Sequence, residues 1–206
     1  MIRALVPYQR FWWIALIVYG LDQCTKWWIL SLDTLPLGSY FSPDSIEIIP
    51  NLFYLVHIGN DGAAWGLLSG QGRLLGCIAL IALVSIYYFR QQLELIKPSI
   101  QICFGLLTGG ILGNVTDRIL HGHVIDFLDF HLPFSMPYLF PNGRYPAFNI
   151  ADCGIVIGVF LYLVLGFFDR QQQADKTEIA ALKTQVSTLE TQLANVLTRL
   201  SALENQ

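Results

Sequence analysis

The side chain most able to do chemistry in this sequence is an aspartate inside a nearly uncharged segment. Asp152 lies one turn into the stretch 148–168, which is long enough to cross the hydrocarbon core of a bilayer as one helix. An ionisable group at such a place costs a few kcal/mol at least, so by default it marks a functional site. The alternative is that Asp152 only caps its helix or touches the headgroup layer.

Other charged and amide side chains lie in or beside apolar segments, and they fall at one expected depth near the outer surface. Asp22 and Lys26 are four residues apart and can pair on one face of a helix. Ordinary interfacial polarity explains Lys26 and Arg118, whose long side chains can reach the headgroups. It explains poorly why aspartates and asparagines from separate segments share one level. The full set is Asp22, Lys26, Asn60, Asn114, Asp117, Arg118, Asp126, Asn149 and Asp152.

Four apolar segments must position these side chains, and each is long enough to span a membrane. They cover about 11–32, 71–90, 98–119 and 148–168. A mean hydropathy of +0.51 and 13% charged residues place the chain in the membrane class. The net charge of −3 gives no indication of a nucleic-acid partner. The sequence predicts an all-α membrane protein with four transmembrane helices.

The placement of Lys and Arg predicts how these helices are oriented. Basic residues precede the first segment, flank the short second connection and follow the fourth segment, whereas 33–71 contains none. Because basic residues are retained on the cytoplasmic side, we expect both termini to be cytoplasmic. The long connections, about 33–70 and 120–147, should face outward. The basic residues in question are Arg3, Arg10, Arg90, Lys97, Arg170, Lys176 and Lys183.

The two outer connections contain enough apolar residues to form structure. An imperfect period of two between Ile46 and Val56 predicts a short strand or hairpin near Pro50-Asn51. Asn60-Asp61-Gly62 is a turn signal. The aromatic and proline-rich stretch 127–146 predicts an amphipathic platform against the outer membrane surface. Together these segments should form a small β and amphipathic platform on the outer face.

The composition changes after Gln173, which predicts a domain of residues 1–173 followed by an extension of residues 174–206. Apolar residues in the extension alternate spacings of three and four over four heptads, which indicates a cytoplasmic coiled coil. We expect a possible homo-oligomer through 179–203. The alternative is a single amphipathic helix on the membrane, although its polar face has few Lys and Arg. The repeat consists of Ile179, Leu182, Val186, Leu189, Leu193, Val196, Leu200 and Leu203.

Five short motifs in this chain resemble those of bacterial lipoprotein signal peptidase, also called signal peptidase II. They are DQCTK at 22–26, NDGAAWG at 60–66, GGILGNVTDR at 109–118, VIDF at 124–127 and FNIAD at 148–152. Each motif alone is a weak signal, but five in the order and spacing of the family are a strong one. The resemblance runs from about residue 11 to 168. Trp65 and Gly66 depart slightly from the family pattern, and the heptads lie outside it.

The resemblance implies an intramembrane aspartyl endopeptidase of the bacterial inner membrane with its active site near the outer face. Such an enzyme cleaves the signal peptide from a prolipoprotein before a diacylglyceryl-modified cysteine. It implies Asp126 and Asp152 as the catalytic pair. One ionised and one protonated carboxyl group suit peptide hydrolysis, because two carboxylates close together in a poorly solvated site cannot both ionise readily. Expected partners are the lipidated substrate and membrane lipid, with no cofactor and no metal.

The remaining motif residues are expected to support the catalytic pair and the substrate. Three asparagines can hydrogen-bond the substrate backbone or orient a carboxylate, and Arg118 can hold Asp22 or another carboxylate. Lys26 can balance Asp22, while a buried structural network is the alternative for all of them. We expect Asp117 and Asp129 either to support the site residues indirectly or to be structural. The supporting set is Asp22, Lys26, Asn60, Gly62, Ala63, Asn114, Arg118 and Asn149.

Two other classes of function compete with a peptidase. A small ion-coupled or proton-coupled transporter also uses buried charges, but it should show internal repeats and polar residues near the midplane. A structural membrane anchor that presents a coiled coil leaves Asp126 and Asp152 unexplained. His121 and His123 form a weak metal motif without an evident third ligand, and Cys153 has no histidine placed to activate it.

Overall fold

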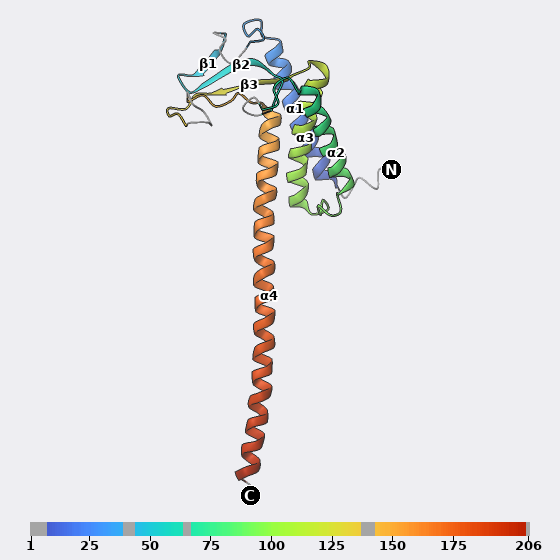
Figure 1. Ribbon diagram of the computed structural model, residues 1–206, viewed down its shortest axis with the longest axis vertical. Helices are drawn as coiled ribbons and strands as arrows, with labels where there is room; N and C mark the ends of the chain where they lie inside the picture. The colour runs from blue at the N-terminus through green and yellow to red at the C-terminus, as the bar shows by residue number, and fades with distance from the viewer. Residues whose placement is uncertain (1–7, 39–43, 64–66, 137–142, 205–206) are drawn as a thin grey trace. The chain divides into compact units, whose positions relative to one another are not determined.

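The computed structural model describes residues 8–38, 44–63, 67–136 and 143–204, and the side chains of these ranges as far as residue 188. Trp65, Gly66, Arg3 and the side chains of the heptad residues from Leu189 onward lie outside this description. The elements in chain order are α1 Gln9–Leu30, β1 Ile46–Ile49, β2 Phe53–Asn60, α2 Gly72–Tyr88, α3 Pro98–Leu120, β3 Val124–Phe130 and α4 Ile150–Glu204 (Figure 1).

Each of the four predicted segments coincides with a helix. In the described chain, α3 with a mean hydropathy of 1.3 and residues Ile150–Thr188 with 2.3 are long and apolar enough to cross a membrane. Gly72–Tyr88 is a shorter apolar helix, and α1 includes the buried charges Asp22 and Lys26. The protein is therefore mostly helical with membrane-length apolar helices, while a crossing by all four helices stays a prediction.

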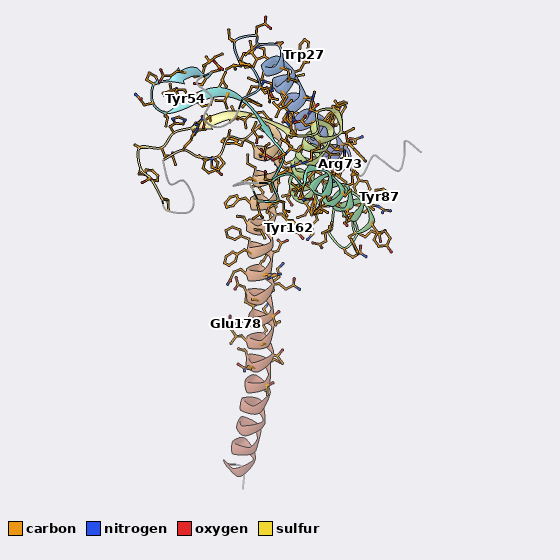
Figure 2. The ribbon with its side chains drawn as sticks, turned by 45° about the horizontal axis from the view of Figure 1, so that its top comes forward. Trp27, Tyr54, Arg73, Tyr87, Tyr162 and Glu178 are labelled. Carbon is orange, nitrogen blue, oxygen red and sulfur yellow. The ribbon has the colours of Figure 1, made fainter. Side chains whose placement is uncertain are left out.

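Several large aromatic side chains on α1 and α2 face away from the protein. Trp27 of α1 is 74% exposed and Tyr87 of α2 is 67% exposed, and both project outward in Figure 2. Such amphipathic rings favour the boundary between hydrocarbon and water. The exposed apolar surface of α1 and α2 fits a lipid environment.

Two compact units divide the chain, residues 1–162 and 163–206, and each is described by itself. The first contains α1 to β3 and the start of α4, and the second is helical as far as Glu204. The predicted boundary after residue 173, close to the start of the heptads, stays a prediction.

Glycines of α3 allow the neighbouring helices to approach its backbone. A Cβ atom at Gly109 would lie 2.6 Å from the carbonyl oxygen of Ala15 in α1. A Cβ atom at Gly110 would collide with the carbonyl oxygen of Ala151 in α4. Small residues permit this close packing in membrane helices. The prediction that Gly109, Gly110 and Gly113 let helices approach closely agrees with these contacts, and α3 packs against both α1 and the start of α4.

A three-stranded antiparallel sheet in the order β1-β2-β3 lies at the end of the helices where α4 begins (Figure 1). The predicted hairpin near Pro50-Asn51 is present as β1 and β2, and Asn51 adopts a φ of 57°, which asparagine tolerates better than most residues. Residues 127–130 were predicted as part of an amphipathic platform, but they belong to β3, which begins at Val124. Their buried side chains lie on both faces of the sheet, so VIDFLDF shows no clear alternation of exposed and buried positions.

The sheet is fixed to the helices by a small apolar core. Ile29 at the end of α1 packs with Leu35, with Leu55 of β2 and with Phe127 of β3. All four side chains are at least nine-tenths buried. This core holds β3, and therefore Asp126, next to the helix ends.

Candidate active site

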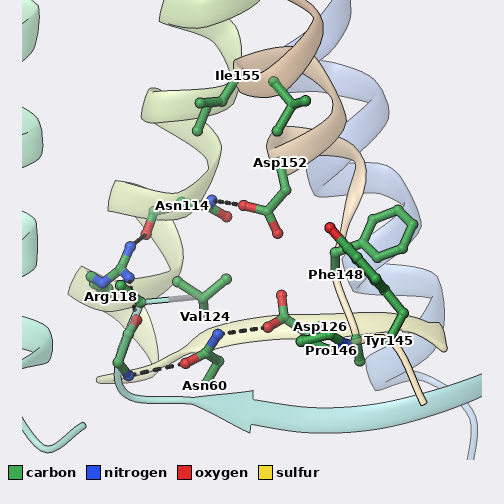
Figure 3. Close-up of a pocket in the computed structure, with 14 residues that line it drawn as sticks. Asn60, Asn114, Arg118, Val124, Asp126, Tyr145, Pro146, Phe148, Asp152 and Ile155 are labelled. Atoms are coloured by element: carbon green, nitrogen blue, oxygen red, sulfur yellow. Dashed lines mark hydrogen bonds between the residues drawn. The ribbon is translucent and has the colours of Figure 1, made fainter. Parts of the chain in front are cut away.

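Asp126 of β3 and Asp152 of α4 line one cavity of about 250 Å³ in the first unit (Figure 3). The two aspartates come from elements that are far apart in the sequence and meet where the sheet lies against the helix ends. The wall of the cavity includes both polar and apolar side chains. The other lining residues are Asn60, Gly62, Ala63, Asn114, Arg118, Val124, Tyr145, Pro146, Ala147, Phe148, Ile155 and Val156.

Asp152 is held at the N-terminus of α4 by a reciprocal cap with Asn149. The backbone N–H of Asp152 donates to Asn149 Oδ1 at 2.9 Å, and the backbone N–H of Asn149 donates to Asp152 Oδ2 at 3.2 Å. This pattern satisfies two N–H groups that a helix start leaves without partners. The capping alternative for Asp152 is therefore correct in part. The other oxygen, Oδ1, accepts from Asn114 Nδ2 at 2.8 Å and lies at the cavity.

Asp126 is 1% exposed, and amide groups from two other elements donate to its carboxyl oxygens. Asn60 Nδ2, at the end of β2, donates to Oδ2 at 2.9 Å, and Asn149 Nδ2 donates to Oδ1 at 2.8 Å. Burial raises the pKa of Asp126 to about 8, and the nearby charge of Asp152 adds to this, while the two amide donors lower it. Asp126 is therefore largely protonated at neutral pH.

A buried lysine lies directly behind the aspartate pair. Lys26 Nζ is 2.8 Å from Asp22 Oδ2 and 2.7 Å from Asp117 Oδ2, and it donates to Asn114 Oδ1 at 3.0 Å. The predicted pairing of Lys26 with Asp22 is present. The pairing with Asp117 was missed, because nothing in the sequence shows that the side chain at 117 turns toward α1. Gln23 was also missed, and it donates to both Asp22 and Asp117 at 3.1 Å.

Asp22 links α1 to the start of α4. Its Oδ1 accepts from the backbone N–H of Ala151 at 2.9 Å, and Gly113 of α3 lies against its carboxylate. Asp22 is fully buried. Because Ala151 directly precedes Asp152, this hydrogen bond lets a residue of α1 support a site on α4.

Arg118 does not hold a carboxylate among the described residues, contrary to the prediction. Its Nη2 donates to the carbonyl oxygen of Gly62 at 3.0 Å, and Nη1 approaches that of Asn114 at 3.4 Å (Figure 3). Asp22 already pairs with Lys26, and Arg118 lies on the side of α3 that faces the loop after β2. Its Nε is buried without a hydrogen-bond partner in the described part of the chain.

Gly62 and Ala63 form the cavity wall that Arg118 contacts. The N–H of Gly62 donates to Asn60 Oδ1 at 3.0 Å, which closes the turn predicted at Asn60-Asp61-Gly62. A Cβ atom at Gly62 would lie 2.9 Å from the carbonyl oxygen of Leu67. The turn therefore requires glycine at this position and directs the Nδ2 group of Asn60 toward Asp126.

The opposite wall consists of residues 145–148, which sequence reasoning did not assign to the site. The backbone of Phe148 bonds to Leu128 of β3 at 2.9 and 3.1 Å, and Tyr145 N donates to Phe130 O at 2.8 Å. Arg144 Nε donates to both carboxyl oxygens of the fully buried Asp129 at 3.1 Å. These contacts extend the sheet by an irregular edge. The available signal was the position of 145–148 directly before Asn149.

A second, largely apolar cavity of about 430 Å³ adjoins the first. Tyr145, Phe148, Asp152 and Val156 line both cavities. The remaining walls of the second are Phe130, Leu132, Cys153 and Ile157. An apolar space of this kind can hold a hydrocarbon group close to the Asp152 carboxyl group.

The histidine pair has no metal-binding geometry in the chain that the structure describes. There, no three His, Cys, Asp or Glu side chains are grouped so that they could hold a metal ion. His121 and His123 have ring centroids 6.2 Å apart. Burial lowers the pKa of His123, because it disfavours the charged form of the ring.

Comparison with known proteins decides the family. The family model described as Signal peptidase (SPase) II matches residues 14–168. The chain belongs to the signal peptidase II family. The lipoprotein signal peptidase of Shewanella oneidensis is 34% identical over 82% of this chain and 92% of its own length. That of Anoxybacillus flavithermus is 35% identical over 79% of this chain and 88% of its own.

Solved structures agree with this family. A bacterial membrane enzyme solved at 2.3 Å is 35% identical, with a TM-score of 0.61 over 76% of this chain and 87% of that one. A second, solved at 1.9 Å, is 36% identical with a TM-score of 0.56. The resemblance inferred from the five motifs is confirmed at the family level, and the family match ends before the heptads.

Proposed function

We propose that this chain is an intramembrane aspartic endopeptidase of the bacterial inner membrane. It removes signal peptides from diacylglyceryl-modified prolipoproteins by cleaving before the lipidated cysteine. Membership of the signal peptidase II family supports the removal of signal peptides from prolipoproteins. The observation that supports the aspartic mechanism is that Asp126 and Asp152 line the same cavity.

The two aspartates have complementary surroundings. With its pKa raised to about 8, Asp126 is protonated at neutral pH and can donate a hydrogen bond to the scissile carbonyl. Asp152 accepts hydrogen bonds from Asn114 and from the backbone at a helix N-terminus, both of which favour a negative charge. We therefore assign Asp126 as the acid and Asp152 as the base, although their titration belongs to the pair.

The reaction then follows from these protonation states. Asp152 takes a proton from water while the water oxygen forms a bond to the carbonyl carbon, and Asp126 supplies a proton to the carbonyl oxygen. When the tetrahedral intermediate collapses, the C–N bond breaks and the leaving amine takes the proton that Asp152 accepted. Asp126 regains its proton from the hydroxyl group of the intermediate as the new carboxyl group forms.

The second cavity supports a lipidated substrate. Its lining is apolar except near Asp152, and it opens beside the aspartate pair. Each methylene buried in such a space contributes about 0.8 kcal/mol. A diacylglyceryl chain placed here would fix the modified cysteine next to the reacting bond. The distribution of Lys and Arg supports a site near the outer face with cytoplasmic termini.

Cleavage of a purified lipidated precursor by aspartate variants tests this proposal. Asp126→Asn and Asp152→Asn each remove one of the two proton-transfer groups, so each should lower turnover by about 1,000-fold or more while the protein still inserts. Asp175→Asn is the matched control, because Asp175 is exposed in the second unit. It should cleave like the wild type.

Substantial turnover by Asp126→Asn or Asp152→Asn at neutral pH would exclude the aspartic assignment. A transporter or a structural anchor predicts no dependence of precursor cleavage on either residue. Circular dichroism of each variant in detergent separates a lost reaction from a lost fold.

A further inference from the structure

The C-terminal part of α4 presents an apolar stripe that the peptidase site does not use. Ile179, Leu182 and Val186 are 53%, 53% and 54% exposed. They lie beyond the family match, which ends at residue 168. In the sequence their spacing of three and four residues continues to Leu203, and the backbone is helical as far as Glu204. An a/d repeat over four heptads is a surface that packs against another helix of the same kind.

We propose that residues 179–203 form a parallel, in-register coiled coil with the same segment of further copies of this chain. Taking Ile179 as position a places Leu182, Leu189, Val196 and Leu203 at d. The sequence at these positions and at Val186, Leu193 and Leu200 is entirely apolar. The partner is therefore a second copy whose stripe has the same length and the same spacing.

Charges beside the stripe favour the in-register pairing. In parallel helices a g side chain faces the next e side chain of the partner. This places Glu178 opposite Lys183 and Arg199 opposite Glu204, so both contacts join opposite charges. A slip of one heptad removes the contact between Arg199 and Glu204. It places Glu178 of one chain opposite Glu190 and Glu178 of the other opposite Lys176, so it retains only one pair of opposite charges of this kind. These pairs select the register more than they strengthen the assembly.

The membrane determines that the helices run in the same direction. The apolar part of α4 precedes the heptads in one continuous helix, and Ile150–Thr188 is apolar enough to cross a bilayer. Every copy of a membrane protein with one topology exposes this extension on the same side. Two copies therefore bring their heptads together in parallel, whereas an antiparallel pairing would require one helix to turn back.

A lipid surface fits the same stripe less well. Residues 174–206 contain three basic and four acidic side chains, so the segment has no net positive charge to attract anionic headgroups. Helices that lie on such membranes generally have Lys and Arg on the polar face. The polar face here is rich in Gln and Thr instead.

Disulfide crosslinking of the full chain in native membranes tests the pairing. Exposed Cys24 and Cys77 are first replaced by Ser, and one cysteine is then added at Leu182 or at Thr184. Position d faces its own counterpart in a parallel in-register pair, whereas Thr184, at f, points away from the partner. We expect a linked oligomer with Leu182→Cys and at least about tenfold less of it with Thr184→Cys.

Two further arms examine direction and register. A mixture of Leu182→Cys and Leu203→Cys chains should give no disulfide between positions 182 and 203. Added to Leu182→Cys, Glu178→Lys should slow crosslinking by about two- to fivefold, and the combination with Lys183→Glu should restore it. Strong crosslinking between 182 and 203 would overturn the parallel arrangement, and an unchanged rate with Glu178→Lys would overturn the register.

No crosslink at Leu182, together with a monomeric mass in detergent, would show that the helix lies alone or on the membrane, and the assembly would be excluded. Equal crosslinking at Leu182 and Thr184 would indicate random collision and would exclude it as well. Precursor cleavage is measured in the same membranes. It should be unaffected by the added cysteines, so this result and the proposed peptidase activity are judged separately.

Discussion

Lys26 determines how one amide of the candidate site is oriented. Its ammonium group has only donors, so the group of Asn114 that it approaches at 3.0 Å must be the carbonyl oxygen. The NH₂ group of Asn114 is then directed to Asp152 at 2.8 Å. Because Lys26 also contacts Asp22 and Asp117, its charge is paired although the side chain is 2% exposed. A buried cation thus positions Asp152 through a neutral amide.

At the same scale, the pH dependence of cleavage should depend on Asn60. In the proposed mechanism Asp126 is the acid, so activity should fall as pH rises through its pKa of about 8. The hydrogen bond from Asn60 favours the ionised form and so lowers this pKa. Asn60→Ala should therefore move the alkaline limb of kcat/KM to higher pH. The measurement is kcat/KM against pH for both proteins on the lipidated precursor.

Asp126 should also change how the unfolding free energy depends on pH, and the direction is the opposite of that for an ordinary carboxylate. The folded state holds a proton on Asp126 between pH 3.8, the ordinary pKa of the group, and about 8, while the unfolded chain loses it near 3.8. The unfolding free energy should therefore decrease as pH rises across this window, and Asp126→Asn should remove that decrease. For cleavage, an alkaline limb of kcat/KM that moves to lower pH in Asn60→Ala would contradict the assignment of Asp126 as the acid.

At the scale of elements, the start of α4 is fixed from two sides. The cap between Asn149 and Asp152 starts the helix, and α3 packs against its first turn at Gly110, where a Cβ atom would collide with the carbonyl oxygen of Ala151. The backbone N–H of the same residue, Ala151, donates to Asp22. A shift of this turn would move Asp152 relative to Asp126.

Gly110→Ala should therefore reduce cleavage although the residue touches no substrate. The added methyl group forces α3 and α4 apart, which should cost about 1–3 kcal/mol of stability. A displacement near 1 Å at a catalytic group can cost about 100-fold in rate. Gly20→Ala is the matched control, because nothing lies within 4 Å of a Cβ atom there. Cleavage rates and unfolding temperatures in detergent decide the outcome, and equal rates for the two variants would refute the effect.

The elements could be predicted from the sequence to different degrees. Apolar length was sufficient for the four helices, and the alternation up to Val56 was sufficient for the hairpin. Strand β3 was missed because both of its faces are buried, which removes the period of two. The contact between Lys26 and Asp117 joins residues 91 positions apart in chain order, and no local pattern specifies it. The contact of Arg144 with Asp129, next to the cavity wall at 145–148, is likewise specified by no local pattern.

At the scale of the whole first unit, the polar side chains gather at one end of the helices. Asp22 and Lys26 lie in the second half of α1, Asn114 and Arg118 near the end of α3, and Asp152 at the start of α4. The sheet lies at this same end (Figure 1). The shared level inferred from the sequence thus corresponds to one group of contacts. The second, largely apolar cavity lies beside this group, and Asp152 lines it as well.

This arrangement predicts that the lipid on the substrate is required for efficient cleavage. About four methylenes buried in the second cavity would contribute about 3 kcal/mol, which corresponds to about 100-fold in kcat/KM. An unlipidated precursor should be poorer by that factor. Ile157 lines only the second cavity, so Ile157→Trp should fill it and lower kcat/KM for the lipidated precursor alone.

The matched control for this prediction is Ile81→Trp, because Ile81 of α2 is 65% exposed and lies in neither cavity. It should leave both substrates unaffected. The measurement is kcat/KM for lipidated and unlipidated precursors with the wild type and both variants. Equal efficiency of the wild type on the two precursors would refute a lipid contribution. An equal loss for both precursors with Ile157→Trp would show that the second cavity binds peptide rather than acyl chain.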